Sequence, residues 1–297
     1  MSTHFDLIAI GGGSGGLAVA ERAAQHGKAV AVVEAAKIGG TCVNTGCVPK
    51  KVMWYAAHLA HAADDANAFG IPTRRGKTDW SKLVRGRDQY VANINAFWDG
   101  HVQQNGITRI NGPARFVDAR SIEVNGEIYS ANHIVVATGG KPVIPKVPGA
   151  ELGISSEGFF ELERQPANVA IIGGGYIGVE LAGVLRALGS EVTVVTQEDR
   201  LLEFFDTMIS ETLTSEMAQQ GVHIHTNFQV AGLADTGSGI VVDSTGGDRV
   251  EGFDCVNWAV GRKPNTFDLN REAAGLVIRA NWIVQSDVYH NSNLTGI

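Results

Sequence analysis

Two cysteines, Cys42 and Cys47, stand five positions apart in the segment GGTCVNTGCVPKK, directly after a predicted strand. The chain has only three cysteines in 297 residues, so it lacks the disulfide framework of small secreted proteins. A pair at this spacing is able to close a disulfide across one helical turn. A thiolate at a helix N-terminus is also stabilised by the helix dipole, which lowers its pKa. The pair therefore favours redox chemistry, with inert buried cysteines as the alternative.

A structural zinc site is the other use of paired cysteines, and it needs four ligands. The sequence has no second cysteine pair, and His58 and His61 could complete a site only in principle. We expect these histidines to lie on the surface or at a cap, and we expect no metal. Cys255, in FDCVNWAV, alternates like a core strand residue and is expected to pack in the core.

Lys50 and Glu180 each follow a glycine-rich segment at the start of a predicted helix. A Lys beside an electron-rich group would stabilise negative charge on that group, and a Glu would balance the charge of a buried Lys. The alternative is two unrelated, solvated charges.

The elements before the cysteine pair have the order strand, glycine turn, helix, strand and acid. The segment 5–10 (FDLIAI) is an apolar run that predicts a buried parallel strand, and GGGSGG at 11–16 precedes a helical stretch that ends at Gly27. Gly11 allows a tight turn, Gly13 lets backbone amides approach a pyrophosphate, and Gly16 permits close packing of helix on strand. Glu34, 18 residues after Gly16, ends the next strand and is able to hold both hydroxyls of an adenosine ribose. This arrangement predicts a dinucleotide site.

The same plan recurs at NVAIIGGGYIGVELAGVLRALGSEVTVVT, where Gly173, Gly175 and Gly178 take the glycine positions. Two sites indicate one tightly held flavin and one exchangeable nicotinamide, since hydride transfer needs a donor and an acceptor. Thr196 lies 18 residues after Gly178, as Glu34 lies 18 residues after Gly16. Gln197, Glu198 and Asp199 follow Thr196. Arg200 is the only cation near this strand end, and Glu203 adds a further acid. We therefore favour NADH over NADPH, whose 2′-phosphate needs cations.

The composition excludes several classes of protein. The formal net charge is −7, and no basic stripe is present to neutralise a nucleic acid. No apolar run approaches the roughly 20 residues that span a bilayer. The N-terminus lacks a signal peptide, so we expect a cytoplasmic protein without a membrane or nucleic-acid partner. The chain has 37 glycines, about 12% of its residues against an average near 7%, and much of this excess lies in two clusters.

The domain plan follows from these motifs and from the proline-rich run at 133–149. We predict an α/β protein with two Rossmann-like domains, the second inserted in the first. Residues 1–150 form an FAD-binding domain with the redox disulfide, and residues 151–266 form an NAD(P)-binding domain. Residues 267–297 make a partial return to the first domain.

At these motifs the chain closely resembles the flavoprotein disulfide reductases, specifically the glutathione reductase family. GGTCVNTGCVPKKVMW, SEGFFEL, GGGYIGVELAGVL and WAVGRKPNT carry the resemblance, which covers essentially the whole chain. It implies a flavin-proximal thiol at Cys47, an interchange thiol at Cys42 that attacks the substrate disulfide, and a lid over the nicotinamide pocket at Tyr176. It also implies that Lys50 and Glu180 form the ion pair beside N5 of the flavin, where the Lys would stabilise negative charge on the reduced ring.

The resemblance further implies contacts with each cofactor. The residues matching FAD contacts are Gly11, Gly13, Ser14, Gly15, Gly16, Glu34, Thr41, Cys42, Lys50, Ala114 and Gly139. Those matching nicotinamide-cofactor contacts are Gly173, Gly174, Gly175, Ile177, Gly178, Glu180, Thr196, Gln197 and Gly261. Ser14 also belongs to the expected substrate site.

Three departures from the family pattern carry information. The two Arg that grip a 2′-phosphate match Gln197 and Glu203 here, which again favours NADH. Glu21 stands where many members have an Arg for a glutathione carboxylate, and Trp98 where they have a Tyr. Since an acid accepts a hydrogen bond from an amide NH2, the pattern resembles the glutathione amide reductase branch, with ordinary glutathione disulfide as the alternative substrate.

The third departure concerns the C-terminus, because family members continue with a GD motif, an Arg for glutathione and a dimerisation domain. We expect this chain to lack them, to bind flavin weakly and to turn over poorly, whereas its full-length parent is an active homodimer. The rival interpretations are a lipoamide dehydrogenase or mercuric reductase, disfavoured by Lys51 and by the FF of SEGFFEL, and a flavin-binding redox module without turnover.

Overall fold

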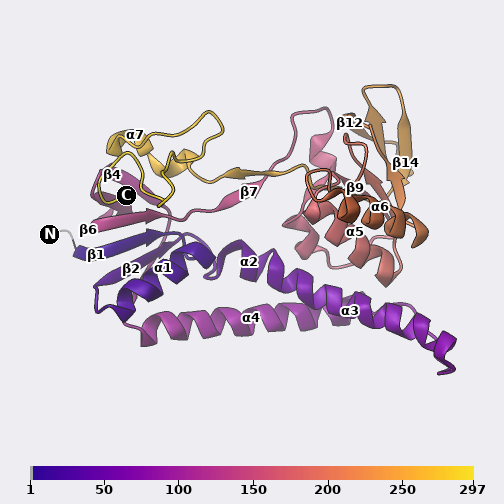
Figure 1. Ribbon diagram of the computed structural model, residues 1–297, viewed down its shortest axis with the longest axis horizontal. Helices are drawn as coiled ribbons and strands as arrows, with labels where there is room; N and C mark the ends of the chain where they lie inside the picture. The colour runs from indigo at the N-terminus through magenta and orange to yellow at the C-terminus, as the bar shows by residue number, and fades with distance from the viewer. Residues whose placement is uncertain (1–2) are drawn as a thin grey trace. The chain divides into compact units, whose positions relative to one another are not determined.

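The computed structural model describes residues 3–297, which divide into two compact units (Figure 1). Unit 1 comprises the described residues up to Val48 together with Gln89–Lys141 and Lys263–Ile297, and unit 2 comprises Pro49–Asp88 and Pro142–Arg262. Residues 49–88 thus belong to unit 2, although they fall within the range predicted for the FAD-binding domain. The assignment of one nucleotide to each domain stays a prediction.

A six-stranded sheet in the order β3-β2-β1-β6-β5-β4 forms the centre of unit 1. Strands β1 to β3 and β6 pair in parallel, whereas β4 and β5 add antiparallel partners. The strands are β1 (Thr3–Ile10), β2 (Val30–Glu34), β3 (Thr108–Asn111), β4 (Ala114–Asp118), β5 (Ser121–Val124) and β6 (Glu127–Val136). The apolar run of β1 is buried because it lies at the centre of a sheet that is covered on both faces.

Helix α1 (Ser14–Gln25) covers one face of this sheet and crosses from β1 to β2. It buries Gly16, Leu17 and Ala20, and Ala20 lies four and three positions after the other two, as expected for the apolar side of an amphipathic helix. Leu17 and Ala20 join Val30 and Val32 in the core of this face. On the other face, η4 (Phe267–Leu269) and α7 (Arg271–Ala274) add Leu269 and Ala274 to a second core.

Unit 2 contains a five-stranded parallel sheet in the order β11-β10-β9-β15-β8 and an antiparallel sheet of three strands. The parallel strands are β8 (Ile154–Ser155), β9 (Asn168–Ile172), β10 (Glu191–Val195), β11 (His223–His225) and β15 (Cys255–Trp258). The antiparallel strands are β12 (Val230–Asp235), β13 (Ile240–Ser244) and β14 (Arg249–Phe253). Helix α5 (Tyr176–Leu188) crosses from β9 to β10, and α6 (Thr207–Gln219) leads to β11.

Two apolar cores hold unit 2 together. One joins α5 to β9 and β10 and includes Met53 and Trp80, which explains why residues 49–88 belong to this unit. The Trp80 Nε1 group also donates to the Leu162 carbonyl at 3.0 Å. The other core joins the parallel sheet to the antiparallel one around Trp258, Val242 and Phe253.

The remaining elements connect these parts. The short helix α2 (Gly40–Asn44) precedes two long helices, α3 (Cys47–Ala66) and α4 (Trp80–Gln104), with η1 (Asn67–Phe69) between them. The chain leaves unit 1 within β7 (Gly140–Pro142) and returns within β16 (Arg262–Pro264), and these two strands pair. Two short 3-10 turns, η2 (Ala150–Leu152) and η3 (Gly158–Glu161), flank β8.

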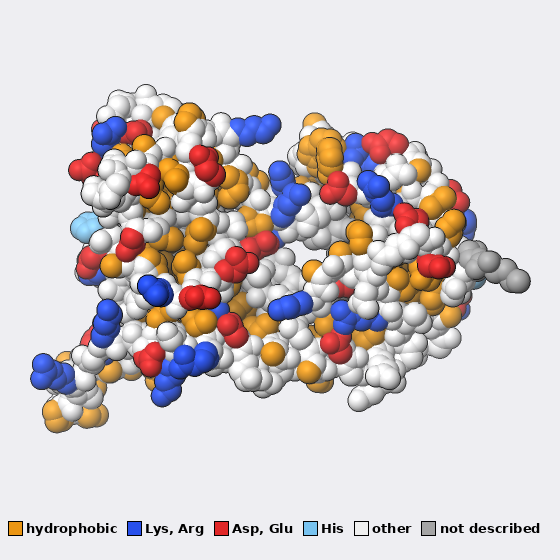
Figure 2. Space-filling view, turned by 180° about the vertical axis from the view of Figure 1, so that it is seen from behind, with side chains coloured by type: hydrophobic (Ala, Val, Ile, Leu, Met, Phe, Trp, Pro, Cys, Tyr) orange, Lys and Arg blue, Asp and Glu red, His pale blue; other side chains and the backbone are white. Residues whose placement is uncertain are grey.

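The surface carries mixed charge. Figure 2 shows Lys and Arg side chains interspersed with Asp and Glu on the face in view, in keeping with the formal net charge of −7. Among the described residues, none of the helices combines the length and the apolar character that crossing a membrane requires.

Candidate functional site

The first glycine turn joins β1 to α1 and depends on two glycines. Gly11 has a φ of +115°, and a Cβ there would lie 2.2 Å from the Ala137 carbonyl oxygen. A Cβ on Gly16 would lie 1.8 Å from the Gly11 oxygen. Gly13 precedes α1, and no side chain caps the first amides of the helix. The turn therefore presents backbone N–H groups to an anion, as a pyrophosphate site requires.

The acid at the end of β2 is held beside this turn. Glu34 accepts hydrogen bonds from the backbone amide of Gly12 at 2.7 Å and from that of Ala36 at 2.8 Å. Each carboxylate oxygen keeps a second acceptor site, so Glu34 is oriented and still able to receive ribose hydroxyls.

The second turn, between β9 and α5, repeats the geometry of the first. Gly173 has a φ of +118°, and a Cβ there would lie 2.4 Å from the Ala259 oxygen. A Cβ on Gly178 would lie 2.1 Å from the Gly173 oxygen, whereas one on Gly175 would meet nothing within 4 Å. No side chain caps the first amides of α5 either. Both turns thus suit a dinucleotide.

The residues after β10 differ from those after β2. The buried Thr196 donates its hydroxyl to Glu198 Oε2 at 2.5 Å, and Gln197 Nε2 donates to Glu198 Oε1 at 3.0 Å. Burial opposes ionisation of Glu198, but these hydrogen bonds outweigh it, so the pKa of Glu198 lies below its ordinary value. Arg200 pairs with Glu203, their Nε and Oε2 atoms 3.2 Å apart. The strand end therefore presents an ionised carboxylate, and the nearby cation Arg200 is already paired.

The two cysteines lie together in unit 1. Cys42 is in α2, Cys47 is the first residue of α3, and both are free thiols. Burial and a hydrogen bond with the Cys47 thiol raise the pKa of Cys42, whereas a hydrogen bond with Ser14 lowers it. The net shift is upward. The cause is desolvation of the charged form inside a helix of five residues.

An asparagine pair that the sequence analysis did not single out holds α2 in place. The Asn44 side-chain amide donates to the carbonyl oxygens of Ile38 and Gly40, at 3.1 and 2.9 Å. Asn95, from α4, donates to the Asn44 side-chain oxygen at 3.1 Å and to the Ile38 carbonyl oxygen at 2.8 Å. The only available signal was an Asn inside the cysteine segment, and nothing local indicated its partner 51 residues away.

Lys50 and Glu180 are brought together in unit 2. Lys50 Nζ lies 2.6 Å from Glu180 Oε1, with 19% of the Lys50 side chain exposed. Tyr176, the first residue of α5, is exposed and lies one turn before Glu180 on that helix. The charges are therefore not two unrelated solvated groups.

Glu21 and Trp98 both contact His101, a residue absent from the sequence-based candidates. His101 Nε2 lies 3.3 Å from Glu21 Oε1, and the His101 ring packs edge-on against Trp98. Phe97 stacks on the same imidazole. Residues from α1 and α4 thus form one cluster in unit 1.

The other predicted residues are distributed over both units, and their roles stay predictions. Ser14 and Gly15 begin α1, Thr41 lies in α2, Ala114 begins β4, and Gly139 precedes β7. In unit 2, Gly174 lies in the second turn and Ile177 in α5, and Gly261, with a φ of +112°, precedes β16.

Cys255 is buried, which raises its pKa to about 11, and the predicted packing role is confirmed. The described residues contain no group of three or more His, Cys, Asp or Glu able to hold a metal ion.

Comparisons with known proteins give consistent results. The family model described as pyridine nucleotide-disulphide oxidoreductase matches residues 5–297. The chain is 40% identical to a glutathione reductase of Schizosaccharomyces pombe and 39% identical to that of Yarrowia lipolytica, with 100% and 99% of this chain covered. It spans 66% of the length of each of these curated relatives.

Solved structures extend this likeness to the fold. The HOCl-induced flavoprotein disulfide reductase RclA of Escherichia coli superposes with a TM-score of 0.86 at 27% identity, covering 98% of this chain and 64% of that one. Its Cu(II) complex gives a TM-score of 0.87 at 26% identity, covering 99% and 64%.

Proposed function

The chain belongs to the pyridine nucleotide-disulphide oxidoreductase family, and on that premise we propose that the protein reduces a small-molecule disulfide of the glutathione class with electrons from NAD(P)H. The observation that carries the proposal is the contact between the Cys42 and Cys47 thiols, beside Ser14 at the start of α1. A dithiol next to a dinucleotide turn is the arrangement that disulfide exchange coupled to a flavin needs.

The two glycine turns support two nucleotides. The uncapped amides of α1, with Glu34 oriented by Gly12, suit FAD, and those of α5 suit the nicotinamide nucleotide. When bound, FAD supplies hydride acceptance and two-electron transfer to a disulfide. Lys50, paired with Glu180, supplies positive charge that favours electron-rich states near it.

The cysteines perform the exchange on the substrate. The Cys42 thiolate attacks one sulfur of the substrate disulfide, forms a mixed disulfide and releases a thiolate, which takes up a proton and becomes the first thiol product. The Cys47 thiolate then attacks the Cys42 sulfur, forms the Cys42–Cys47 disulfide and releases the second thiol. Two electrons leave the protein in each cycle and are restored from NAD(P)H.

The end of β10 favours NADH as the donor. Glu198 is ionised, is held by Thr196 and Gln197, and is suited to accept hydrogen bonds from ribose hydroxyls. The same carboxylate repels a 2′-phosphate, and the pairing of Arg200 with Glu203 leaves that cation engaged.

Glu21 favours an amidated glutathione as the substrate. A carboxylate at this place accepts from an amide NH2 and repels a carboxylate. The contact with His101 orients Glu21, and the adjoining Trp98 ring offers an apolar surface. A homodimer, which rests on the family resemblance, and a cytoplasmic location are further parts of the proposal.

Anaerobic steady-state rates with NADH and NADPH, each against glutathione disulfide and its bis-amide, test this function. We expect the highest kcat/KM with NADH and the bis-amide. A preference for NADPH and glutathione disulfide would retain the disulfide reductase and overturn the roles of Glu198 and Glu21. Absence of disulfide reduction by flavin-loaded protein, with Cys42→Ser indistinguishable from wild type, would overturn the function itself.

A further inference from the structure

The segment 38–47, which carries both redox cysteines, has little structure that is stable by itself. Its helix, α2, has five residues, too few for a helix to persist without outside contacts. Gly39, before the helix, and Gly40, its first residue, have φ values of +94° and +58°, so the chain turns sharply here. The positions of the two sulfurs therefore depend on what holds this segment.

Two asparagines hold the segment, one from inside it and one from α4. The Asn44 amide, between the two cysteines in the sequence, donates to the carbonyl oxygens of Ile38 and Gly40 at 3.1 and 2.9 Å. The Asn95 amide donates to the same Ile38 oxygen at 2.8 Å and to the Asn44 side-chain oxygen at 3.1 Å. We refer to these hydrogen bonds of Asn44 and Asn95 as the asparagine network.

Asn95 is the part of this network that lies outside the cysteine segment. Its side chain is half-buried, and Ile38, whose carbonyl receives both amides, is 1% exposed. An apolar side chain at position 95 would remove one partner of the Ile38 carbonyl and the donor to the Asn44 oxygen. The start and the end of α2 are thus both fixed to one side chain of a long helix.

This attachment bears on how readily the two cysteines join. The Cys42 sulfur already has hydrogen bonds with the thiol and the backbone of Cys47. Closing a disulfide removes conformational freedom from the reduced segment, and the loss is smaller when other contacts hold that segment in place. Contacts that keep the reduced segment in its closed form therefore favour the disulfide and speed the attack of one sulfur on the other.

We propose that Asn95 is a positioning residue that raises the effective concentration of the Cys47 thiolate at the Cys42 sulfur. The inference rests on the proposed function, in which a substrate disulfide oxidises this pair. The Cys47 thiolate attacks the Cys42 sulfur of the mixed disulfide, and the bond between Cys42 and the substrate sulfur breaks. The substrate sulfur leaves with the electron pair of that bond and takes up a proton.

Redox equilibrium with glutathione tests this role without NAD(P)H. The full chain is equilibrated anaerobically with mixtures of glutathione and its disulfide, and the Cys42–Cys47 disulfide is measured by alkylation and mass spectrometry. We expect Asn95→Ala to lower the equilibrium constant for disulfide formation at least about ten-fold, which makes the reduction potential about 30 mV less negative. Acid quenching at short times should also show a longer-lived mixed disulfide at Cys42.

Two failures of this experiment have different meanings. If the wild-type pair forms no disulfide at any glutathione ratio, the proposed function is overturned and the role of Asn95 with it. If wild type and Asn95→Ala give the same constant, only the role of Asn95 is overturned. A bond that stabilised the reduced and oxidised forms alike would leave the constant unchanged, so a purely structural contribution gives the second result.

Asn93→Ala is the matched control on the same helix. Asn93 is exposed, lies two positions before Asn95 and accepts a hydrogen bond from Gln89 at 3.0 Å. The two variants make the same change in helix propensity, but only Asn95→Ala removes bonds to the cysteine segment. Asn93→Ala should leave the constant unchanged, and equal effects of the two variants would overturn the inference.

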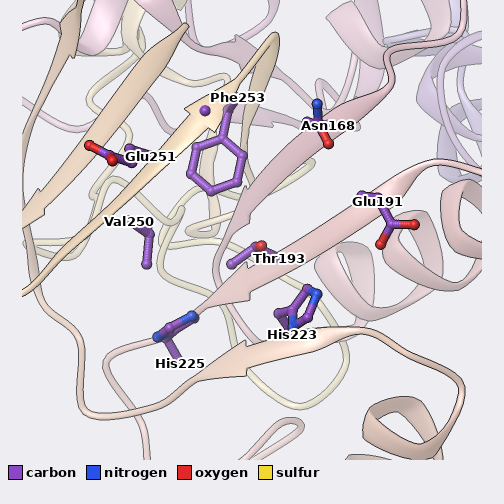
Figure 3. Close-up of a pocket in the computed structure, with 9 residues that line it drawn as sticks. Asn168, Glu191, Thr193, His223, His225, Val250, Glu251 and Phe253 are labelled. Atoms are coloured by element: carbon purple, nitrogen blue, oxygen red, sulfur yellow. The ribbon is translucent and has the colours of Figure 1, made fainter.

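A second control separates the effect from a general loss of stability. Thr193 belongs to unit 2, on the interior strand β10, and lines a hollow of about 370 Å³ with His223, His225 and Phe253 (Figure 3). Thr193→Ala removes a β-branched side chain that favours a strand, so its urea midpoint should fall. Its cysteine equilibrium should match wild type, and a change as large as that of Asn95→Ala would overturn the inference.

A double-mutant cycle tests whether the two asparagines act through one network. Asn44→Ala should also lower the constant, because it removes the bonds to Ile38 and Gly40. Since Asn95 donates to the Asn44 oxygen, the double variant should lose less than the product of the two single effects. Fully independent effects would show that Asn95 does not act through the segment and would overturn its role.

Discussion

Lys50 and Glu180 are 130 positions apart in the sequence, yet the Lys50 ammonium lies 2.6 Å from the Glu180 carboxylate. Lys50 lies three residues after Cys47 on α3, and Glu180 lies in the second turn of α5. One contact thus joins a helix that begins with a cysteine to the helix that follows the second glycine turn.

Replacing Lys50 should slow electron transfer more than it lowers stability. In Lys50→Ala we expect flavin reduction by NADH to be at least about ten-fold slower, because the positive charge that favours the reduced state is lost. The free energy of unfolding should fall by less than about 1 kcal/mol, since the pair is partly exposed. Stopped-flow absorbance and urea titration measure the two effects. Lys51→Ala, which removes an exposed neighbour lying over the Trp54 ring, is the control, and equal rates in both variants would contradict the role of Lys50.

Iodoacetamide should discriminate among the three cysteines. At pH 8 a thiol with a pKa of about 11 is only about 0.1% thiolate, and Cys255 is also buried. We expect mass spectrometry of the native reduced protein to find label on Cys42 and Cys47 and none on Cys255. Early labelling of Cys255 would show that β15 opens or that its thiol is not desolvated.

Cys255 should also make stability depend on alkaline pH. Burial raises its folded-state pKa from 9.0 to about 11, so the unfolded chain loses this proton first as the pH rises. The stabilisation is complete below about pH 9 and is lost as the pH rises towards about 11. Urea midpoints measured across this range should fall less steeply in Cys255→Ala than in wild type. Parallel slopes would contradict the assignment.

The nucleotide preference should be reversible at the end of β10. In Gln197→Arg with Glu203→Arg, two cations replace a neutral side chain and an acid, and Arg200 loses its partner. We expect the ratio of NADPH to NADH affinity, measured by fluorescence titration, to rise at least about ten-fold. Glu211→Arg, which changes the charge on exposed α6, should leave the ratio unaltered.

Two glycines three positions apart should respond differently to the same added methyl group. Gly178→Ala places a Cβ 2.1 Å from a backbone oxygen and should lower the free energy of unfolding by roughly 2–4 kcal/mol. In Gly175→Ala the added Cβ meets no atom within 4 Å, and residue 175 has an ordinary φ of −75°. The free energy of unfolding should therefore change by less than about 1 kcal/mol. Thermal unfolding compares the two, and comparable losses would show that the turn differs from the one described.

The local elements were predictable from the sequence, whereas their partners were not. Apolar runs bounded by glycine turns define β1, α1 and β2, and the same signals define β9, α5 and β10. By contrast, Met53 and Trp80 indicate in the sequence only that one side of each helix is apolar. In the structure they share a core with Val169 and Leu185, which follow about a hundred residues later.

The site shows the same division. The geometry of the glycines and of Glu34 was predictable because it is local: a positive φ, a close approach of two backbones or the end of a strand. The contact of His101 with Glu21 joins α4 to α1, and the bond from Asn95 to Asn44 joins α4 to α2. No sequence pattern marks either of these two contacts, because both depend on how separate helices pack.

The division of the chain into units sets an order of completion during synthesis. Unit 2 ends at Arg262, and residues Lys263–Ile297, which belong to unit 1, follow it in the sequence. The ribosome therefore releases all of unit 2 before Leu269, Ala274 and Leu276 can cover one face of the unit 1 sheet. Until then, Phe116 and Ile134 lack those late neighbours, so the nascent chain exposes apolar surface on the part that began to fold first.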